Sequence, residues 1–218
     1  MAKNLRTLSK QLRNQGYTLL TSFANTYKPG SVVHEERWDR FSMLGMMQSS
    51  MPKAGFPAVE GPEAIGLMDF TRNHELTVNA AVEWLGNNVT LTGKPASVVD
   101  VVARFEGAES YRLDLLNLQD LLNRQEAQFW DSALGAHLLT KNTRVVYEVI
   151  YARLSFQFRN SGGLGVAVNL AENKGGVKLN AGASYQWKNE ATLEMKKPMV
   201  VALELAQWDR KRRMLLAV

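Results

Sequence analysis

Polar and hydrophobic residues alternate along the stretch from Leu154 to Met195, the most regular pattern in the chain. Successive side chains of a β-strand point to opposite faces, so a period of two predicts strands rather than helices. The residues 172–176, which end in Gly-Gly, separate two such runs and predict a hairpin turn. The residues expected on the apolar face of this hairpin are Leu164, Val166, Val168, Leu170, Val177, Leu179, Ala181, Ala183, Tyr185 and Trp187.

This alternation has two interpretations. The first is an antiparallel sheet with one face on a core and the other in water. The second is a ribbon that lines an aqueous pore with its apolar side in lipid, for which a tilted strand needs about 9–11 residues. The run from Val177 to Trp187 is long enough, and the run from Leu164 to Ala171 is slightly short. Gly and Ala are frequent here and large aliphatic residues are few, which favours a segment that changes its packing partners.

The remaining patterns predict an α+β fold, namely a twisted, mainly antiparallel sheet with amphipathic β-hairpins and a few peripheral helices. Asn117 and Asp131 are expected to cap two helices that run to about Ala127 and Leu139. The stretch 37–66 is rich in Met, Pro and Gly and predicts loops with a short helical turn near 41–47, whereas 76–85 fits either a strand or a helix. Strands are expected at 17–23, 31–35, 97–105, 110–115, 144–151 and 199–208, with a turn at Gly107-Ala108.

Positive charge is concentrated at two places, although the net charge is only +5. The first is the tail, where Arg210, Lys211, Arg212 and Arg213 follow Asp209. The second is the first helix, where Leu5, Leu8 and Leu12 form an apolar stripe at helical spacing opposite the cationic stripe Lys3, Arg6, Lys10 and Arg13. Such a helix fits an ordinary solvated surface, an anionic lipid surface or a nucleic acid.

The sequence offers no catalytic constellation. It has no cysteine, its three histidines lack ligand spacing, and its carboxylates are scattered. Gly162 to Gly165 lies in a hairpin context rather than before a helix, and neither a nucleophile elbow nor a zinc-binding His-Glu motif is present. Neither an apolar leader nor a run of about 18 apolar residues is seen, so we expect a chain made in soluble form. We therefore predict a non-enzymatic protein with no metal site and no cofactor.

Several segments together resemble the pore-forming domain of the gasdermins, above all the compact bacterial members. They are the basic first helix, the opening strand Gly16-Tyr17-Thr18-Leu19-Leu20, the loose stretch from Leu44 to Pro62, the strand pair and helix from Phe105 to Leu122, the strand Arg144 to Ile150, and the closing strands from Thr192 to Trp208. The resemblance is one of layout and extends over most of the chain.

The resemblance implies a specific course of action. Gasdermins are soluble until a protease removes an inhibitory C-terminal piece; they then bind membranes, oligomerise and insert two amphipathic hairpins per subunit into a large β-barrel. Here residues 1–208 would be the pore-forming domain, and the tail 209–218 a short inhibitory peptide with its cleavage region at Arg210, Lys211, Arg212 and Arg213. The first membrane contacts would be Lys3, Arg6, Lys10 and Arg13. The inserting ribbons would be 76–91 with 97–105 and, better supported, 153–171 with 177–195.

The partners implied by the resemblance are membrane lipids, an activating protease and further copies of the chain, with no nucleic acid. The protein would be cytoplasmic when inactive and at a membrane when active. Two features depart from the family: the cysteine near the N-terminus that bacterial members often lipidate is absent, and the tail is short. The alternative is a soluble, non-enzymatic module that binds a protein or lipid through its sheet face and basic first helix. A nucleic-acid binder that uses this helix and the arginine cluster is a third hypothesis.

Overall fold

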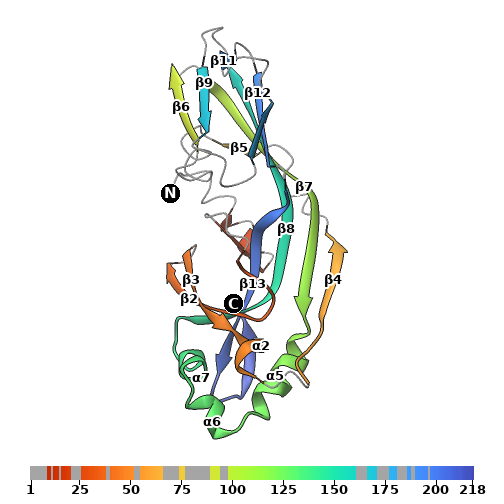
Figure 1. The fold of residues 1–218 in the computed structure, drawn as a ribbon, viewed down its shortest axis with the longest axis vertical. Helices are drawn as coiled ribbons and strands as arrows, with labels where there is room; N and C mark the ends of the chain where they lie inside the picture. Colours follow the sequence, from red (N-terminus) through yellow and green to blue (C-terminus); the bar gives the residue numbers. More distant parts are fainter. Residues whose placement is uncertain are drawn as a thin grey trace.

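The protein is an elongated molecule in which two long strands connect a helix-bearing lower body to an upper group of strands (Figure 1). This computed structural model describes residues 9–10, 12–14, 16–20, 26–37, 40–51, 55–65, 74–76, 89–93, 98–160, 166–170, 177–180, 186–187, 190–195 and 197–218.

The long strands are β7 (Val98–Leu113) and β8 (Thr143–Asn160), which pair antiparallel from Val98 opposite Asn160 to Arg112 opposite Glu148. The other edge of β8 has two successive neighbours. Its lower half pairs with β13 (Met199–Asp209) and its upper half with β12 (Glu190–Met195). β8 therefore runs through both parts of the molecule and joins them in one sheet.

Among the described residues, the main sheet has 11 strands and a second sheet has three. Shorter strands complete the main sheet: β1 (Tyr17–Leu19), β2 (Ser31–Arg37), β3 (Arg40–Met46), β4 (Val59–Ala64), β5 (His74–Leu76), β10 (Val177–Asn180) and β14 (Met214–Ala217). The second sheet consists of β6 (Val89–Gly93), β9 (Val166–Leu170) and β11 (Gln186–Trp187). All the strand pairs described are antiparallel, which confirms the predicted α+β class with a mainly antiparallel sheet.

The lower body buries both faces of its sheet. One face packs against α2 (Met47–Ser50), α5 (Leu115–Asn123), α6 (Ala127–Trp130) and α7 (Ala133–Leu138), with Leu118, Leu122, Leu138, Val145 and Trp208 in a single cluster. The opposite face carries a second cluster that contains Leu20, Val33, Val149, Leu203 and Leu205. A strand covered on both faces reads as a continuous apolar run, which is why β13 lacks alternation.

Two local predictions for the strands are wrong. Residues 41–46 lie in β3, and the helical turn begins only at Met47. Gly107-Ala108 does not reverse the chain, because β7 continues through it to Leu113. A register shift between Glu106 and Glu109 forms a bulge there, and Gly107 adopts a positive φ of 58°. Bulges commonly use such a residue, so the glycine that suggested a turn instead bends one strand.

The bulge lies beside a second irregularity in the sheet. Opposite it on β8 is Ala152, which pairs with Met199, the first residue of β13. Three residues further along β8, Ser155 already pairs with Glu194 of β12. The bulge in β7 and the exchange of partners on β8 therefore occur at the same level, between the lower body and the upper strands.

Both predicted helix caps are displaced by a few residues. α5 begins after Asp114, whose Oδ1 accepts hydrogen bonds from the amides of Leu116 (2.8 Å) and Asn117 (2.9 Å). α7 begins after Ser132, whose hydroxyl accepts from the Gly135 amide at 3.2 Å. Asn117 lies inside the first helix, and Asp131 ends α6, a short helix that was not predicted; the predicted second helix corresponds to α7. The nearby Asp and Ser satisfy the free amide groups at the helix starts.

Candidate functional site

The described part of the first helix has the two-faced character predicted for it. Leu12 is 1% exposed and Ser9 is buried, whereas Lys10 and Arg13 are exposed. The last described helical residue is Arg13, whose carbonyl accepts from the Gly16 amide at 3.0 Å, and Gly16 has a φ of +91°. Lys3 and Arg6 lie outside the described residues. The two described cations are therefore accessible to solvent, while the apolar side of the helix is buried.

The predicted inserting hairpin is divided between the two sheets. Val166, Val168 and Leu170 lie in β9, which pairs with β6 and with the short β11 that contains Trp187. Val177 and Leu179 lie in β10, which pairs with β12 of the main sheet. We expected Val177 to Trp187 to form one strand that pairs with 164–171. This is wrong for residues 177–180, because β10 pairs with β12 instead of β9. Leu164, Ala181, Ala183 and Tyr185 lie outside the described residues.

The first predicted ribbon is also only partly described. The predicted stretch 76–91 begins in β5 and ends in β6. β5 pairs with β7 at Val101 to Ala103, as the predicted ribbon requires, whereas β6 pairs with β9. Residues 77–88 lie outside the described part of the chain. The partner stretch 97–105 is the start of β7, as predicted, and β7 continues beyond it.

In the part of the predicted ribbon that lies in β8, buried and exposed side chains alternate less regularly than the sequence predicts. Arg153 is exposed and Leu154 and Phe156 are fully buried, but Ser155 is also buried at 8% exposure. Gln157 accepts a hydrogen bond from Arg104 of β7 at 3.3 Å, which links polar side chains of the two strands. The polar face of this ribbon is thus covered at Ser155 and open at Arg153.

The basic tail forms a hairpin with β13. β13 ends at Asp209, the turn occupies 210–213, and β14 pairs back from Met214 opposite Asp209 to Ala217 opposite Ala206. Asp209 Oδ1 accepts from the amides of Lys211 (2.8 Å) and Arg212 (3.1 Å), which closes the turn. Arg213 has a φ of 54°, a strained value for a non-glycine residue that contacts elsewhere must hold in place.

Contacts with helix α5 keep Arg213 in this conformation. The Arg213 guanidinium donates to the Asn123 carbonyl (2.8 Å) and to its side-chain oxygen (3.1 Å), and Asn123 Nδ2 donates back to the Arg213 carbonyl at 3.1 Å. Gln119 Oε1 accepts from the Leu215 amide at 3.1 Å, and the Leu215 side chain is 4% exposed. We call Gln119, Asn123, Arg213 and Leu215 the helix–turn clasp. It fastens the predicted cleavage region to the lower body.

Removal of the arginine from this clasp gives a testable expectation. Arg213→Ala should lower the free energy of unfolding by about 1–2 kcal/mol, because it removes charge-assisted hydrogen bonds that are partly open to water. Local opening should rise with it, so a trypsin-like protease should nick the native chain at 210–212 several-fold faster. Urea unfolding and timed digestion measure both effects. Arg210→Ala is the matched control, since it removes one cation from the same turn, and equal nicking of both variants would contradict the role of the clasp.

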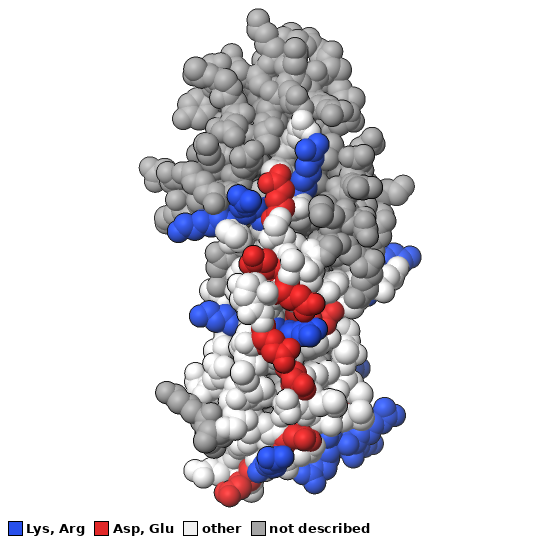
Figure 2. Space-filling view, turned by 90° about the vertical axis from the view of Figure 1, so that its right-hand side faces the viewer, with Lys and Arg blue, Asp and Glu red and all other residues white. Residues whose placement is uncertain are grey.

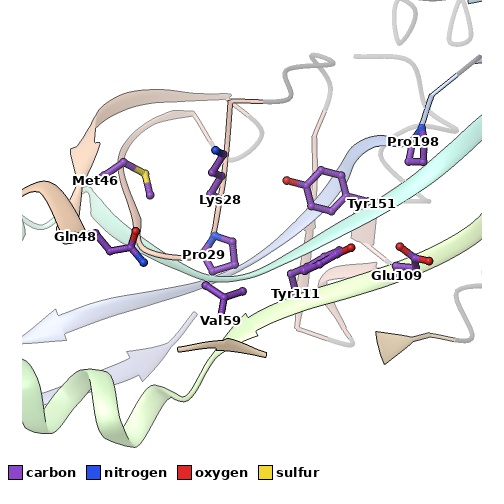
Figure 3. Close-up of a pocket in the computed structure, with 9 residues that line it drawn as sticks. All are labelled: Lys28, Pro29, Met46, Gln48, Val59, Glu109, Tyr111, Tyr151 and Pro198. Atoms are coloured by element: carbon purple, nitrogen blue, oxygen red, sulfur yellow. The ribbon is translucent and has the colours of Figure 1, made fainter. Parts of the chain in front are cut away.

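A cavity of about 430 Å³ lies where the β7–β8 pair meets the start of β2 and the end of β3 (Figure 3). Tyr111 and Tyr151 form its floor, with ring centroids 5.5 Å apart in an edge-to-face arrangement, and Lys28, Met46 and Val59 also line it. Burial raises the pKa of the Tyr151 phenol, which therefore stays neutral. The lining is mostly apolar, and no sequence pattern indicates this cavity because its residues come from six separate segments.

The face that presents β4 and β7 carries acidic side chains along its length, interrupted by basic ones, with a basic group at the lower end (Figure 2). Glu60, Glu63, Glu106 and Glu109 are exposed on these two strands. Arg112 pairs with Glu60 at 3.3 Å and with Glu63 at 3.8 Å. The acidic side chains of these two strands would repel an anionic lipid surface.

Within the described ranges, no three His, Asp or Glu side chains are grouped so that they could hold a metal ion. No helix in the described part of the chain combines the length and the apolar character needed to cross a bilayer.

Comparison with known proteins identifies the fold. No family model matches the sequence, and no curated protein matches it. Among solved structures, the chain is similar to a bacterial gasdermin from Bradyrhizobium tropiciagri, with a TM-score of 0.58 and 13% sequence identity. The similarity covers 97% of this chain and 90% of the other. At this identity the likeness shows the fold, so the chain has a gasdermin-like fold, as its segment order predicted.

Proposed function

We propose that this protein is a pore-forming effector that binds membranes, oligomerises and inserts β-hairpins to permeabilise a bilayer. One observation carries the proposal: the gasdermin-like fold extends over 97% of the chain rather than over an isolated motif. The protein would act without enzymatic chemistry and without a cofactor. It would be cytoplasmic before activation and membrane-bound afterwards.

Two features of the described residues support this proposal. The exposed Lys10 and Arg13 on a helix whose Leu12 is buried offer cations to anionic headgroups while the apolar face stays on the body. The long β7–β8 pair carries the upper strands on one continuous ladder from the lower body. A ladder of this kind can transmit assembly of the bodies to the ribbons that would enter the bilayer.

The helix–turn clasp bears on how proteolysis would activate the protein. A cut at 210–212 falls in an exposed turn, where proteases act readily. The severed piece would still be held by the β13–β14 ladder, by buried Leu215 and by Arg213 on Asn123. We therefore propose that activation needs the piece to dissociate after the cut, as well as the cut itself.

Dye release from vesicles tests the proposed function. The intact chain and the chain cut at the 210–213 turn are added to vesicles rich in phosphatidylglycerol and to vesicles of phosphatidylcholine alone. We expect release only from the anionic vesicles, greater after cutting, together with oligomers in detergent extracts. A chain that stays monomeric and releases no dye in either state would instead support the non-enzymatic binding module.

A further inference from the structure

A row of polar side chains crosses five neighbouring strands of the main sheet. Tyr17 on β1 lies opposite Glu204 on β13, and Glu204 lies opposite Glu148 on β8. Glu148 lies opposite Arg112 on β7, and Arg112 lies opposite Glu60 on β4. Residues directly opposite one another in antiparallel strands have neighbouring side chains on the same face of the sheet. The five residues therefore form one continuous row through the lower body.

Two carboxyl groups lie side by side in the middle of this row. Glu148 is 7% exposed, and Glu204 is half-buried and hydrogen bonded both to Glu148 and to the Tyr147 hydroxyl. The register slips between Glu204 and Leu205, so that Tyr147 and Glu148 both oppose Glu204, and this bulge directs the two side chains toward it. Two carboxyl groups can hydrogen bond to each other only when one of them carries a proton.

The charges around the pair favour that proton. Burial is the main factor that raises the pKa of Glu204 above its ordinary value of 4.5, and the neighbouring Glu148 raises it further. Arg112 lowers it, but this guanidinium already pairs with Glu60 at 3.3 Å and Glu63 at 3.8 Å and is about half exposed. Arg112 thus acts on Glu60, Glu63, Glu148 and Glu204 together. The Tyr147 hydroxyl also lowers the pKa of Glu204, because its hydrogen bond stabilises the charged carboxylate, but burial outweighs it and the net pKa is raised.

The pair lies beneath the junction between the first helix and β1. A Cβ built on Gly16 would be 3.3 Å from Glu204 Oε1, so the carboxyl group lies against the backbone at this point. β1 itself is only three residues long and pairs with β13 alone among the described strands. Burial raises the pKa of Tyr17 to about 12, with the charges of Glu148 and Glu204 adding to it, so this phenol stays neutral beside the pair. A second negative charge in the row would act directly on the weakest strand of the body.

We propose that Glu148 and Glu204 form a shared-proton site that fastens β1, and with it the first helix, to the body sheet, and that loss of the proton loosens this attachment. The attached state holds the proton more tightly than the released state does. Attachment is therefore fully favourable below the ordinary carboxyl pKa and weakens as the pH rises toward the raised pKa of Glu204. The proton site depends on the row alone. Its consequence, that lower pH holds back the basic helix and higher pH frees it for a membrane, rests on the proposed function.

Hydrogen exchange of the full chain between pH 5 and pH 8 tests the site. Rates corrected for intrinsic exchange are measured for 17–20, where the Leu20 amide donates to the Val201 carbonyl at 3.0 Å. Protection should fall with rising pH, by about tenfold for each unit by which the pKa differs between the attached and released states. Glu204→Gln keeps a donor–acceptor pair with Glu148 but removes the carboxyl group whose pKa is raised, so protection of 17–20 should no longer change between pH 5 and pH 8. Glu148→Gln leaves Glu204 buried and removes only the neighbouring charge, so it should reduce the pH dependence without abolishing it.

The exposed Glu106→Gln on β7 is the matched control and should keep the pH dependence of the natural chain. Carbon-13 titration of the natural chain is a second readout that needs no variant, and it should show Glu204 titrating above the usual carboxyl range. Protection that falls with pH in Glu204→Gln as it does in the natural chain would overturn the proposal, as would an ordinary titration of Glu204. Neither measurement involves vesicles, so failure of the proton site and failure of pore formation remain distinguishable.

Discussion

Leu179→Asp combined with Ala183→Asp should abolish dye release from anionic vesicles while the chain still folds. Both positions belong to the apolar parity of the upper ribbon. In the proposed pore this parity faces hydrocarbon, where a carboxylate costs of the order of 2 kcal/mol, and each subunit would bring two. Because every subunit of an oligomer carries the same cost, release should fall well over tenfold. Fluorescence dequenching follows the release, and circular dichroism reports the fold.

The neighbouring polar positions provide the control for this variant. Asn180→Asp with Ser184→Asp adds the same two charges one residue further on, where the parity would face water. We expect this pair to release dye at a rate close to that of the natural chain. If both double variants behave alike, the upper ribbon does not meet lipid with one face, and the insertion step is wrong.

Gly135→Ala should strongly destabilise the lower body, because the added methyl group has no room between two helices. A Cβ at Gly135 would lie against the Phe129 carbonyl oxygen and 2.7 Å from Trp130 Cα, which are backbone atoms of α6. α7 would have to move away from α6, and Trp130 stacks on Trp208 with ring centroids 5.6 Å apart, so the displacement would reach the core. We expect a loss of about 3 kcal/mol in the free energy of unfolding. Urea denaturation monitored by tryptophan fluorescence measures it.

Gly45→Ala is the control for Gly135→Ala, because it also replaces a glycine of the lower body but brings the new Cβ against a side chain rather than against backbone atoms. A Cβ there would be 3.3 Å from Leu134 Cδ1, the end of a flexible side chain in the same core. That methyl group can turn aside, so the loss should stay below about 1 kcal/mol. Similar losses in the two variants would mean that α6 and α7 adjust without strain.

The lower body was largely predictable because its signals are local. Runs of β-branched and apolar residues placed β8 from Arg144 and β13 from Met199, within one residue of their observed starts. Helix starts were less predictable, since several capping residues compete within a few positions. The side chains of Asp114 and Ser132 accept hydrogen bonds from the free amides at the two helix starts. Asn117 and Asp131 have side chains that could cap a helix equally well, so the sequence does not distinguish between them.

Features that depend on strand pairing were not predictable from the pattern. Parity shows which residues share a face but not which strand is the neighbour, so β9 and β10 were expected to pair with each other. The same limit hid the row from Tyr17 to Glu60, whose members are far apart in sequence and meet only through the register. The basic cluster at 210–213 was visible, but its partners Gln119 and Asn123 carry no distinguishing signal in the sequence.

The bulge at Gly107-Ala108 coincides with the level at which β8 exchanges β13 for β12. At that level no described strand continues along the outer edge of β8, and β7 already departs from regular pairing. A pivot placed there would let the upper strands swing as a unit over a fixed base, with every hydrogen bond of β7 and β8 above and below it retained. Motion of the ribbons would then be a change of angle between paired strands that leaves their ladder intact.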